Sequence, residues 1–148
     1  MLKEAIESLR IKQSGIYVDL TYGGGGHSKK ILNSLGKNGK LFAFDQDSDA
    51  SKNKIHDKRL FFINQNFRFL KQNLKYHNCD FVDGILADLG VSSHQLDNPE
   101  RGFAARFDSN LDMRMNQNLK FKAEDVLNNY SEQKLSYIFF KYSDLKNS

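Results

Sequence analysis

The fold is decided by one stretch near the start of the chain, GIYVDLTYGGGGHSKKILNSLG (residues 15–36). It opens on a β-branched and aromatic run, Ile16-Tyr17-Val18, which is typical of a strand and ends at Asp19. Four glycines follow, Gly23 to Gly26, and residues 28–35 then show helical spacing up to Gly36. The stretch therefore predicts a strand, a glycine turn and a helix, in that order.

The same alternation continues outward from this stretch. Further strands are short apolar runs that end at polar residues, and they are predicted at residues 41–44, 60–63 and 81–87. Helices are predicted at residues 2–10, 48–55 with Ser48 as the cap, 67–74, 123–128 and 131–142. Strands that alternate with helices of this length imply right-handed crossovers and a mostly parallel sheet. The predicted fold class is therefore α/β.

Residues 90–118 break this pattern. They contain the single proline, Pro99, and show no sustained apolar period, so a long irregular loop is predicted there. A loop of that length is usually functional or disordered. We therefore expect an α/β half-domain over residues 1–98, and an irregular loop followed by helices over residues 99–148.

The composition is that of an ordinary folded protein. Hydrophobic residues make up 39% and charged residues 27% of the 148 residues, which is too apolar for a disordered chain. No apolar run approaches the ~18 residues of a membrane helix, and no secretory leader opens the chain, so we expect a cytoplasmic protein. Cys79 is the single cysteine, which excludes a disulfide framework. The formal charge of +4 suits an anionic partner, although a lysine-rich composition by itself gives the same excess.

The glycine turn and one acidic residue indicate a ligand. Open parallel sheets bind ligands beyond the carboxyl ends of their strands, where the glycines lie. Asp45 ends the second strand 22 residues after Gly23, a spacing at which a carboxylate accepts ribose hydroxyls. The pair predicts an adenosine-type ligand, but it does not separate a dinucleotide from S-adenosylmethionine. A turn that merely needs positive φ, with Asp45 near a helix cap, stays open as the structural alternative.

A third polar segment, DLGVSSHQLD (residues 88–97), follows the fourth predicted strand. It brings the strand-end carboxylate of Asp88, and several hydroxyl and amide groups, to the same edge of the sheet. Taken alone, the pattern is also typical of an ordinary polar loop.

Several stretches occur in the order in which one enzyme family carries them, namely Gly15–Asp19, Gly23–Ser28, Asp45–Asp47, Asp88–Ser93, Gln95–Asp97, Glu100–Phe103 and Leu111–Met115. Through them the chain resembles the bacterial 16S ribosomal RNA (cytosine-N4) methyltransferase family, also called MraW or RsmH. The resemblance runs from Leu2 to Tyr142, and its last two stretches are far more specific than a glycine pattern.

The resemblance implies a Rossmann-like class I fold that binds S-adenosylmethionine and methylates N4 of a cytidine in small-subunit ribosomal RNA, with the rRNA or the 30S subunit as partner. It also implies the residues that contact the cofactor. These are Gly25, Gly26 and His27 at the glycine turn, Asp45 at the ribose, Phe67 near the adenine, and Asp88 and Gln95 in the loop after the fourth strand. The chemistry is a direct displacement that requires no metal. Asp88 or the Ser92-Ser93 backbone could accept a hydrogen bond from the cytosine amino group, so no catalytic residue is singled out.

The chain departs from the family pattern at His94, at Ala104-Ala105 and at Ser143-Asp144. It also lacks the family's segment before the first helix and everything beyond the last one. The resemblance therefore covers an N-terminal portion, a truncated fold with the start of a helical insertion. In this interpretation residues 1–98 bind the cofactor and residues 99–148 begin the RNA-facing insertion.

Within that insertion, Arg101, Arg106 and Arg114 are candidate phosphate contacts. Two other functions compete with the methyltransferase. One is a truncated remnant that binds cofactor or RNA without turnover, which is consistent with a resemblance to only half of the family's length. A nicotinamide-dependent dehydrogenase shares the glycine turn and Asp45, but it leaves the segments around Asp88 and Met113 unexplained.

The missing part also affects the sheet. In the class I arrangement that the chain resembles, a later segment pairs along the outer side of the fourth strand, and here no later segment reads as a strand. The backbone groups of Ile85 and Leu86 would then form an exposed apolar edge. We therefore expect the chain alone to self-associate through this edge or to be marginally stable.

Overall fold

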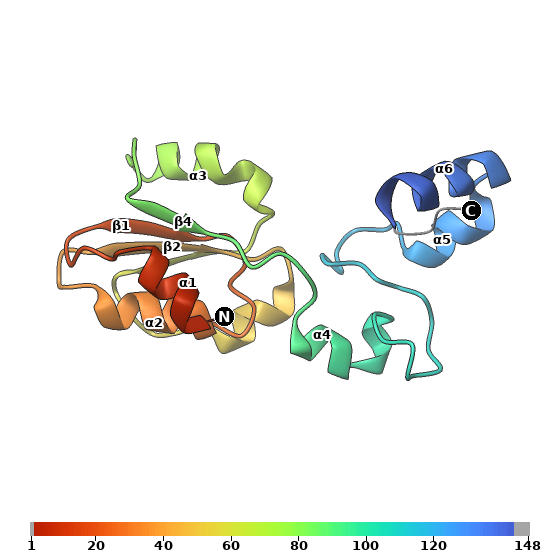
Figure 1. Ribbon diagram of the computed structural model, residues 1–148, viewed down its shortest axis with the longest axis horizontal. Helices are drawn as coiled ribbons and strands as arrows, with labels where there is room; N and C mark the ends of the chain where they lie inside the picture. The colour runs from red at the N-terminus through yellow and green to blue at the C-terminus, as the bar shows by residue number, and fades with distance from the viewer. Residues whose placement is uncertain (1, 144–148) are drawn as a thin grey trace. The chain divides into compact units, whose positions relative to one another are not determined.

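The computed structural model describes residues 2–143, and the chain forms two compact units, Met1–Ser92 and Ser93–Ser148 (Figure 1). Asp144, one of the departures from the family pattern, lies outside the described residues. The expected division into functional domains after Asn98 stays a prediction. No helix among the described residues is long and apolar enough to cross a membrane.

The first unit is built on a four-stranded parallel sheet in the order β3-β2-β1-β4. Its strands are β1 Ile16–Asp19, β2 Lys40–Phe44, β3 Leu60–Ile63 and β4 Gly84–Leu86. The chain steps outward from β1 to β3 and then returns to the other side of β1, so the strand order reverses between β1 and β4. The predicted α/β fold class is confirmed, and this reversal is where such sheets bind ligands.

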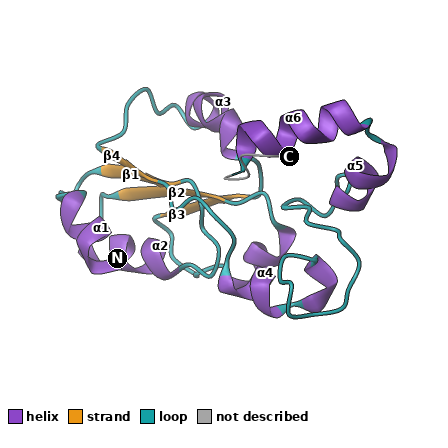
Figure 2. Ribbon diagram, turned by 45° about the vertical axis from the view of Figure 1, so that its right-hand side comes forward, coloured by secondary structure: helices purple, strands orange, loops and turns teal. Residues whose placement is uncertain are grey.

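Helices cover both faces of this sheet (Figure 1, Figure 2). On one face lie α1 Leu2–Ser8 and α2 Gly26–Ser34, and on the other lies α3 Leu70–Tyr76. Short 3-10 turns, η1 Ser48–Asn53 and η2 Phe67–Phe69, follow β2 and β3. Each strand is therefore followed by a helical element, as the alternating pattern predicts.

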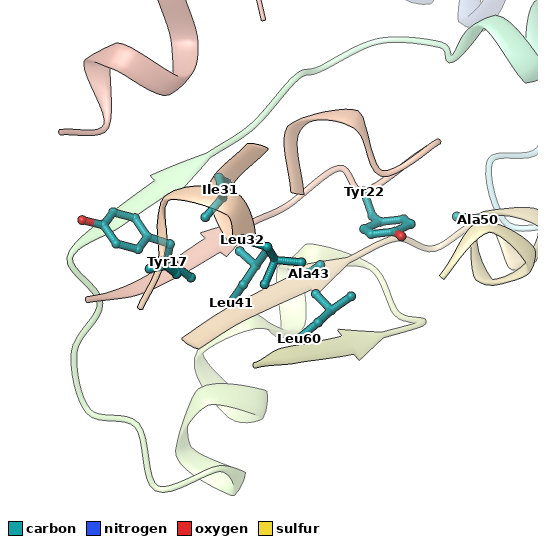
Figure 3. Packing of buried hydrophobic residues seen from close by; sticks show 9 residues of the cluster. Tyr17, Tyr22, Ile31, Leu32, Leu41, Ala43, Ala50 and Leu60 are labelled. Carbon is teal, nitrogen blue, oxygen red and sulfur yellow. The ribbon is translucent and has the colours of Figure 1, made fainter. Parts of the chain in front are cut away.

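The strand side chains alternate between two cores, because successive residues of a strand point to opposite faces. The core under α2 includes Tyr17, Ile31, Leu32, Leu41 and Ala43 (Figure 3). The core under α3 includes Val18, Phe42 and Phe44, against which Leu70 and Leu74 pack. Strands that are apolar toward both faces are expected in a parallel sheet covered on both sides.

Several helix boundaries differ from the prediction, and two of these differences have a local cause. α2 begins at Gly26 and not at Ser28, because Gly25 takes a left-handed conformation, with φ of 78°, and starts the helix. The element after β2 is a 3-10 turn that ends at Asn53, and its cap is Asp47 in place of Ser48. The Asp47 side chain accepts the backbone N–H of Asp49 at 3.0 Å, which a serine one residue later could not do.

The fourth strand is shorter than predicted. Regular pairing with β1 starts at Gly84, and Phe81 is 72% exposed. Asp83 bonds to β1 through both its backbone and its side chain, because its N–H donates to the Ile16 carbonyl at 2.7 Å and its carboxylate accepts the Ile16 N–H at 2.9 Å. The carboxylate also accepts the Lys12 ammonium at 3.0 Å. The Ile16 N–H is thus taken by a side chain, and the regular register of the ladder begins one residue further on, with Tyr17 opposite Gly84.

The second unit contains α4 Ser93–Asp97, η3 Pro99–Arg101, α5 Ala123–Asn129 and α6 Glu132–Tyr142. The helices predicted near its end are confirmed, with Ser131 as the cap of α6. The prediction of an irregular loop over residues 90–118 is wrong where α4 and η3 form. The Asn98 side chain caps η3 by accepting the Glu100 N–H at 3.0 Å.

Two family-like stretches, Glu100–Phe103 and Leu111–Met115, meet inside the second unit. The Met113 N–H donates to the Arg101 carbonyl at 3.0 Å. Gly102 has a φ of 69°, and a Cβ there would lie 2.5 Å from the Asn110 carbonyl oxygen, so only glycine fits. These two stretches therefore pack against each other, and that packing requires glycine at position 102.

Candidate functional site

The glycine turn lies between β1 and α2, at the carboxyl end of the sheet. Gly23 and Gly25 have positive φ, 52° and 78°, which other residues adopt at a cost. A Cβ on Gly25 would lie 2.7 Å from the Tyr22 hydroxyl. A Cβ on Gly24 or Gly26 would meet no atom within 4 Å. Gly25 is therefore required by the turn itself, whereas Gly24 and Gly26 border open space.

Tyr22 packs against Gly25 and supports the glycine turn, a role that was not predicted from the sequence. Its side chain is buried, its hydroxyl donates to the Asn53 carbonyl at 2.8 Å, and it accepts the Ile55 N–H at 3.0 Å. Burial raises the pKa of this phenol, so it stays neutral. An aromatic residue directly before a glycine run is the sequence signal that could have indicated it.

Asp45 reaches the glycine turn from the end of β2. One carboxylate oxygen accepts the Gly23 N–H at 2.7 Å and the other accepts the Asp47 N–H at 2.9 Å. An ionised carboxylate only accepts hydrogen bonds, which suits this side chain to hydroxyl donors. Asn64 holds the following turn by donating to the carbonyls of Asp45 and Asp47, at 2.8 and 3.1 Å.

Phe67 is brought toward this acidic turn by its neighbour Asn66. Asn66 donates to the Gln46 side chain at 2.8 Å and accepts the Arg68 N–H at 2.9 Å, which caps the turn that begins at Phe67. Phe67 is 39% exposed, which is high for a large hydrophobic residue.

His27 and Asp88 face each other across the strand reversal. His27 follows Gly26 in the first turn of α2, and its Nδ1 lies 3.9 Å from the Asp88 Oδ2. The Asp88 side chain is 68% exposed. The structure therefore brings the glycine turn, Asp45, His27 and Asp88 to one edge of the sheet.

A buried carboxylate that the site prediction did not include lies beneath this edge. Asp19 has no exposed surface, and it accepts the Ser28 hydroxyl at 2.7 Å and the Thr21 N–H at 3.1 Å. Burial raises the pKa of Asp19, while the Ser28 hydroxyl and the Thr21 N–H oppose that rise.

Gln95 belongs to the second unit, whereas the other predicted contacts belong to the first. Its side chain is buried and donates to the Met115 sulfur at 3.4 Å. Its predicted role at the cofactor stays a prediction.

The expectation that three arginines contact phosphate is wrong for Arg101. Its side chain is buried and donates to the Arg114 carbonyl at 2.9 Å. Arg114 makes a two-point ion pair with Asp112, at 2.9 and 2.6 Å, and also donates to backbone carbonyls. Arg106 is the exposed member of the three and pairs with Asp97. Arg101 and Arg114 therefore stabilise the second unit by bonds within it.

Together the fold and the site define a class of protein, a Rossmann-like α/β domain with a glycine turn after its first strand and an acid after its second. Within this class the whole chain, residues 1–148, matches the family described as the MraW methylase family. The chain belongs to that family, and the resemblance drawn from the sequence is confirmed.

Relatives with the name "Ribosomal RNA small subunit methyltransferase H" are similar over the whole chain. The protein of Flavobacterium johnsoniae is 59% identical over 148 residues, that of Christiangramia forsetii 56% and that of Bacteroides fragilis 52%. All of this chain aligns with 49% of each of these relatives. The chain therefore spans about half the length of the curated relatives that it matches.

Proposed function

We propose that this chain carries the S-adenosylmethionine site of an rRNA methyltransferase that acts on N4 of a cytidine in small-subunit (16S) ribosomal RNA. Family membership and the names of the relatives support the reaction class. The observation that carries the site is that Gly24 and Gly26 border open space, while the Asp45 carboxylate bonds to the N–H of Gly23 in the same turn. The alternative, a truncated chain that binds cofactor or RNA without turnover, is distinguished by the methyl-transfer experiment.

The residues present fit this cofactor. The side-chain-free surface at Gly26 lets a ligand approach the backbone at the start of α2. We assign Asp45 to the ribose hydroxyls, Phe67 to the adenine, and His27 and Asp88 to the edge where β1 and β4 part. Gly25 shapes the turn, and Gln95 is proposed as a contact from the second unit.

The chemistry that S-adenosylmethionine supplies when bound is a methyl group on a positively charged sulfur, open to attack by a nitrogen lone pair. The chain's contribution is alignment of the reacting groups, which supplies most of the acceleration in such a displacement. The candidate acceptors for a hydrogen bond from the cytosine amino group are the Asp88 carboxylate and the Ser92-Ser93 backbone.

The surface charge supports an RNA partner for the first unit. This unit carries the whole formal excess of +4, because the second unit has eight acidic and eight basic residues. Between Gly26 and Cys79 every aspartate is at least partly buried, whereas the lysines of this stretch are exposed. Exposed cations bind phosphates by displacing counterions, so we expect the rRNA or the 30S subunit to contact this unit, in the cytoplasm.

Titration calorimetry with S-adenosylmethionine, and with NAD as the competing ligand, tests the cofactor. Asp45→Ala removes charge-assisted hydrogen bonds and is expected to weaken binding by about 1.5 to 3 kcal/mol, or about 10- to 150-fold. Gly26→Val fills the open space and is expected to abolish binding in a chain that keeps its circular dichroism spectrum. Gly25→Val is not a suitable variant, because its side chain would collide with Tyr22. Binding of NAD in preference to S-adenosylmethionine would reject the proposal.

Transfer of radiolabelled methyl groups to small ribosomal subunits tests the reaction. Incorporation at a cytidine N4 supports the methyltransferase. Cofactor binding without any incorporation, also in the presence of a protein segment that supplies the other half of a relative, would favour the remnant that binds without turnover.

A further inference from the structure

The ladder between β1 and β4 ends in an irregular way at the strand reversal. The Leu20 N–H donates to the Leu86 carbonyl at 2.9 Å and so extends the ladder by one residue. A regular parallel ladder would next join the Asp88 N–H to the Leu20 carbonyl. The Asp88 N–H donates instead to the side-chain hydroxyl of Thr21, at 2.8 Å.

Thr21 stands where the backbone turns from one neighbouring strand to the other. In a regular strand, N–H groups two residues apart point to the same neighbour. Here Leu20 bonds to β4, whereas the Tyr22 N–H bonds to the Phe44 carbonyl of β2 at 2.8 Å. Asp19 holds the turn, because its carboxylate accepts the Thr21 N–H two residues on, a local bond that aspartate favours.

The same carboxylate holds the start of α2. Asp19 accepts the Ser28 hydroxyl at 2.7 Å, and neither side chain has exposed surface. Ser28 follows His27, whose ring faces the Asp88 carboxylate. The start of α2 and the end of β4 are therefore tied to one buried group, through Ser28 on one side and through Thr21 on the other.

We propose that Thr21 is a positioning residue, whose hydroxyl sets the direction in which Asp88 leaves β4 and so holds its carboxylate at the cofactor. This inference rests on the proposed function, because it assigns a role within the same site. Asp19 supports Thr21 from the buried side. A hydroxyl is suited to the task because it accepts the Asp88 N–H in place of the Leu20 carbonyl that a regular ladder would use.

A matched pair of substitutions isolates the hydroxyl. Thr21→Val keeps the shape of the side chain and removes the acceptor, and it is expected to weaken S-adenosylmethionine binding about 5- to 20-fold. Thr21→Ser restores the acceptor and is expected to bind within about twofold of the original chain. Hydrogen exchange of the Asp88 amide provides a second measurement, since it is expected to quicken in Thr21→Val and not in Thr21→Ser.

A double-mutant cycle with Asp88→Ala distinguishes positioning from a general loss of structure. If Thr21 acts through Asp88, Thr21→Val has little further effect on affinity in the Asp88→Ala chain. A loss of undiminished size in that chain, or equal affinity of Thr21→Val and the original chain, overturns the proposal. Failure of the original chain to bind S-adenosylmethionine would instead reject the proposed function, and the role of Thr21 with it.

Discussion

The two units are held together in different ways. Every buried hydrophobic side chain that the structure describes lies in the first unit, between Tyr17 and Leu86. The buried side chains described in the second unit are polar, Gln95 and Arg101, and its aromatic residues reach the surface, with Phe140 67% exposed. The first unit therefore has the hydrophobic cores of an independent domain, and the second has a network of hydrogen bonds.

This difference predicts unequal stability. Burial of a large apolar side chain contributes about 1.5 to 3 kcal/mol, whereas an intramolecular hydrogen bond contributes about 0.5 to 1.5 kcal/mol net. We therefore expect the second unit to open at a lower free energy than the first, and the exposed aromatic residues of α6 to matter little for folding of this chain.

The largest expected effect is loss of a core side chain in the first unit. Phe42 is 1% exposed and stacks on Phe61 at 4.9 Å, so Phe42→Ala is expected to cost about 3 to 5 kcal/mol in urea unfolding. Phe140→Ala, the matched substitution in the second unit, is expected to change stability by less than about 0.5 kcal/mol. Equal losses for the two variants would contradict the comparison.

The next effect is confined to the second unit. Asp112→Asn breaks the two-point pair with Arg114 and is expected to quicken proteolytic cleavage between Arg101 and Ala123 by roughly tenfold. Cleavage in the first unit is expected to stay unchanged. Asp97→Asn, which removes the exposed pair with Arg106, is the control and is expected to leave both rates alone.

Asp112 in the second unit and Asp19 in the first are expected to lose their contributions to stability in different pH ranges. The guanidinium of Arg114 lowers the pKa of Asp112, so its contribution is complete above its unfolded-state pKa, about 3.9, and is lost as pH falls through the folded-state value. Burial raises the pKa of Asp19, so its contribution is complete below about 3.9 and is lost as pH rises through the folded-state value.

Hydrogen exchange followed by unit is the measurement for this difference. The contribution of Asp19 to the stability of the first unit should fall as the pH rises above about 3.9, and the contribution of Asp112 to the second unit should fall as the pH drops below about 3.9. Asp19→Asn and Asp112→Asn should each remove one of the two dependences. If either variant leaves the pH dependence of its own unit unchanged, the assignment of that dependence is wrong.

The smallest effect on folding concerns the sheet edge. β4 is the last strand of the described sheet, and Ile85 is 48% exposed, which fits the proposal of self-association through this edge. Ile85→Lys is expected to shift sedimentation toward the monomer while it changes stability by less than about 0.5 kcal/mol. Tyr76→Lys, on the exposed surface of α3, should not change association. A chain that is monomeric before any substitution contradicts the proposal.

Local patterns were sufficient for most of the fold. The four strands, the glycine turn and the two last helices were predictable because each is marked by residues close together in the chain, such as Ile16-Tyr17-Val18 before the glycines. The family was also readable from the sequence, since short stretches in fixed order identify it. Asp45 could be placed beside the glycine turn by spacing alone, and its bond to Gly23 confirms that placement.

Only the tertiary structure decided what each of these residues does there. It divided the glycines into one that the turn requires, Gly25, and one that faces open space, Gly26, because the difference depends on where Tyr22 packs. It turned Arg101 from an expected phosphate contact into a buried donor. It also joined Thr21 to Asp88, which are 67 residues apart. Such contacts form between segments that fold together from distant parts of the chain, so no local periodicity or spacing records them.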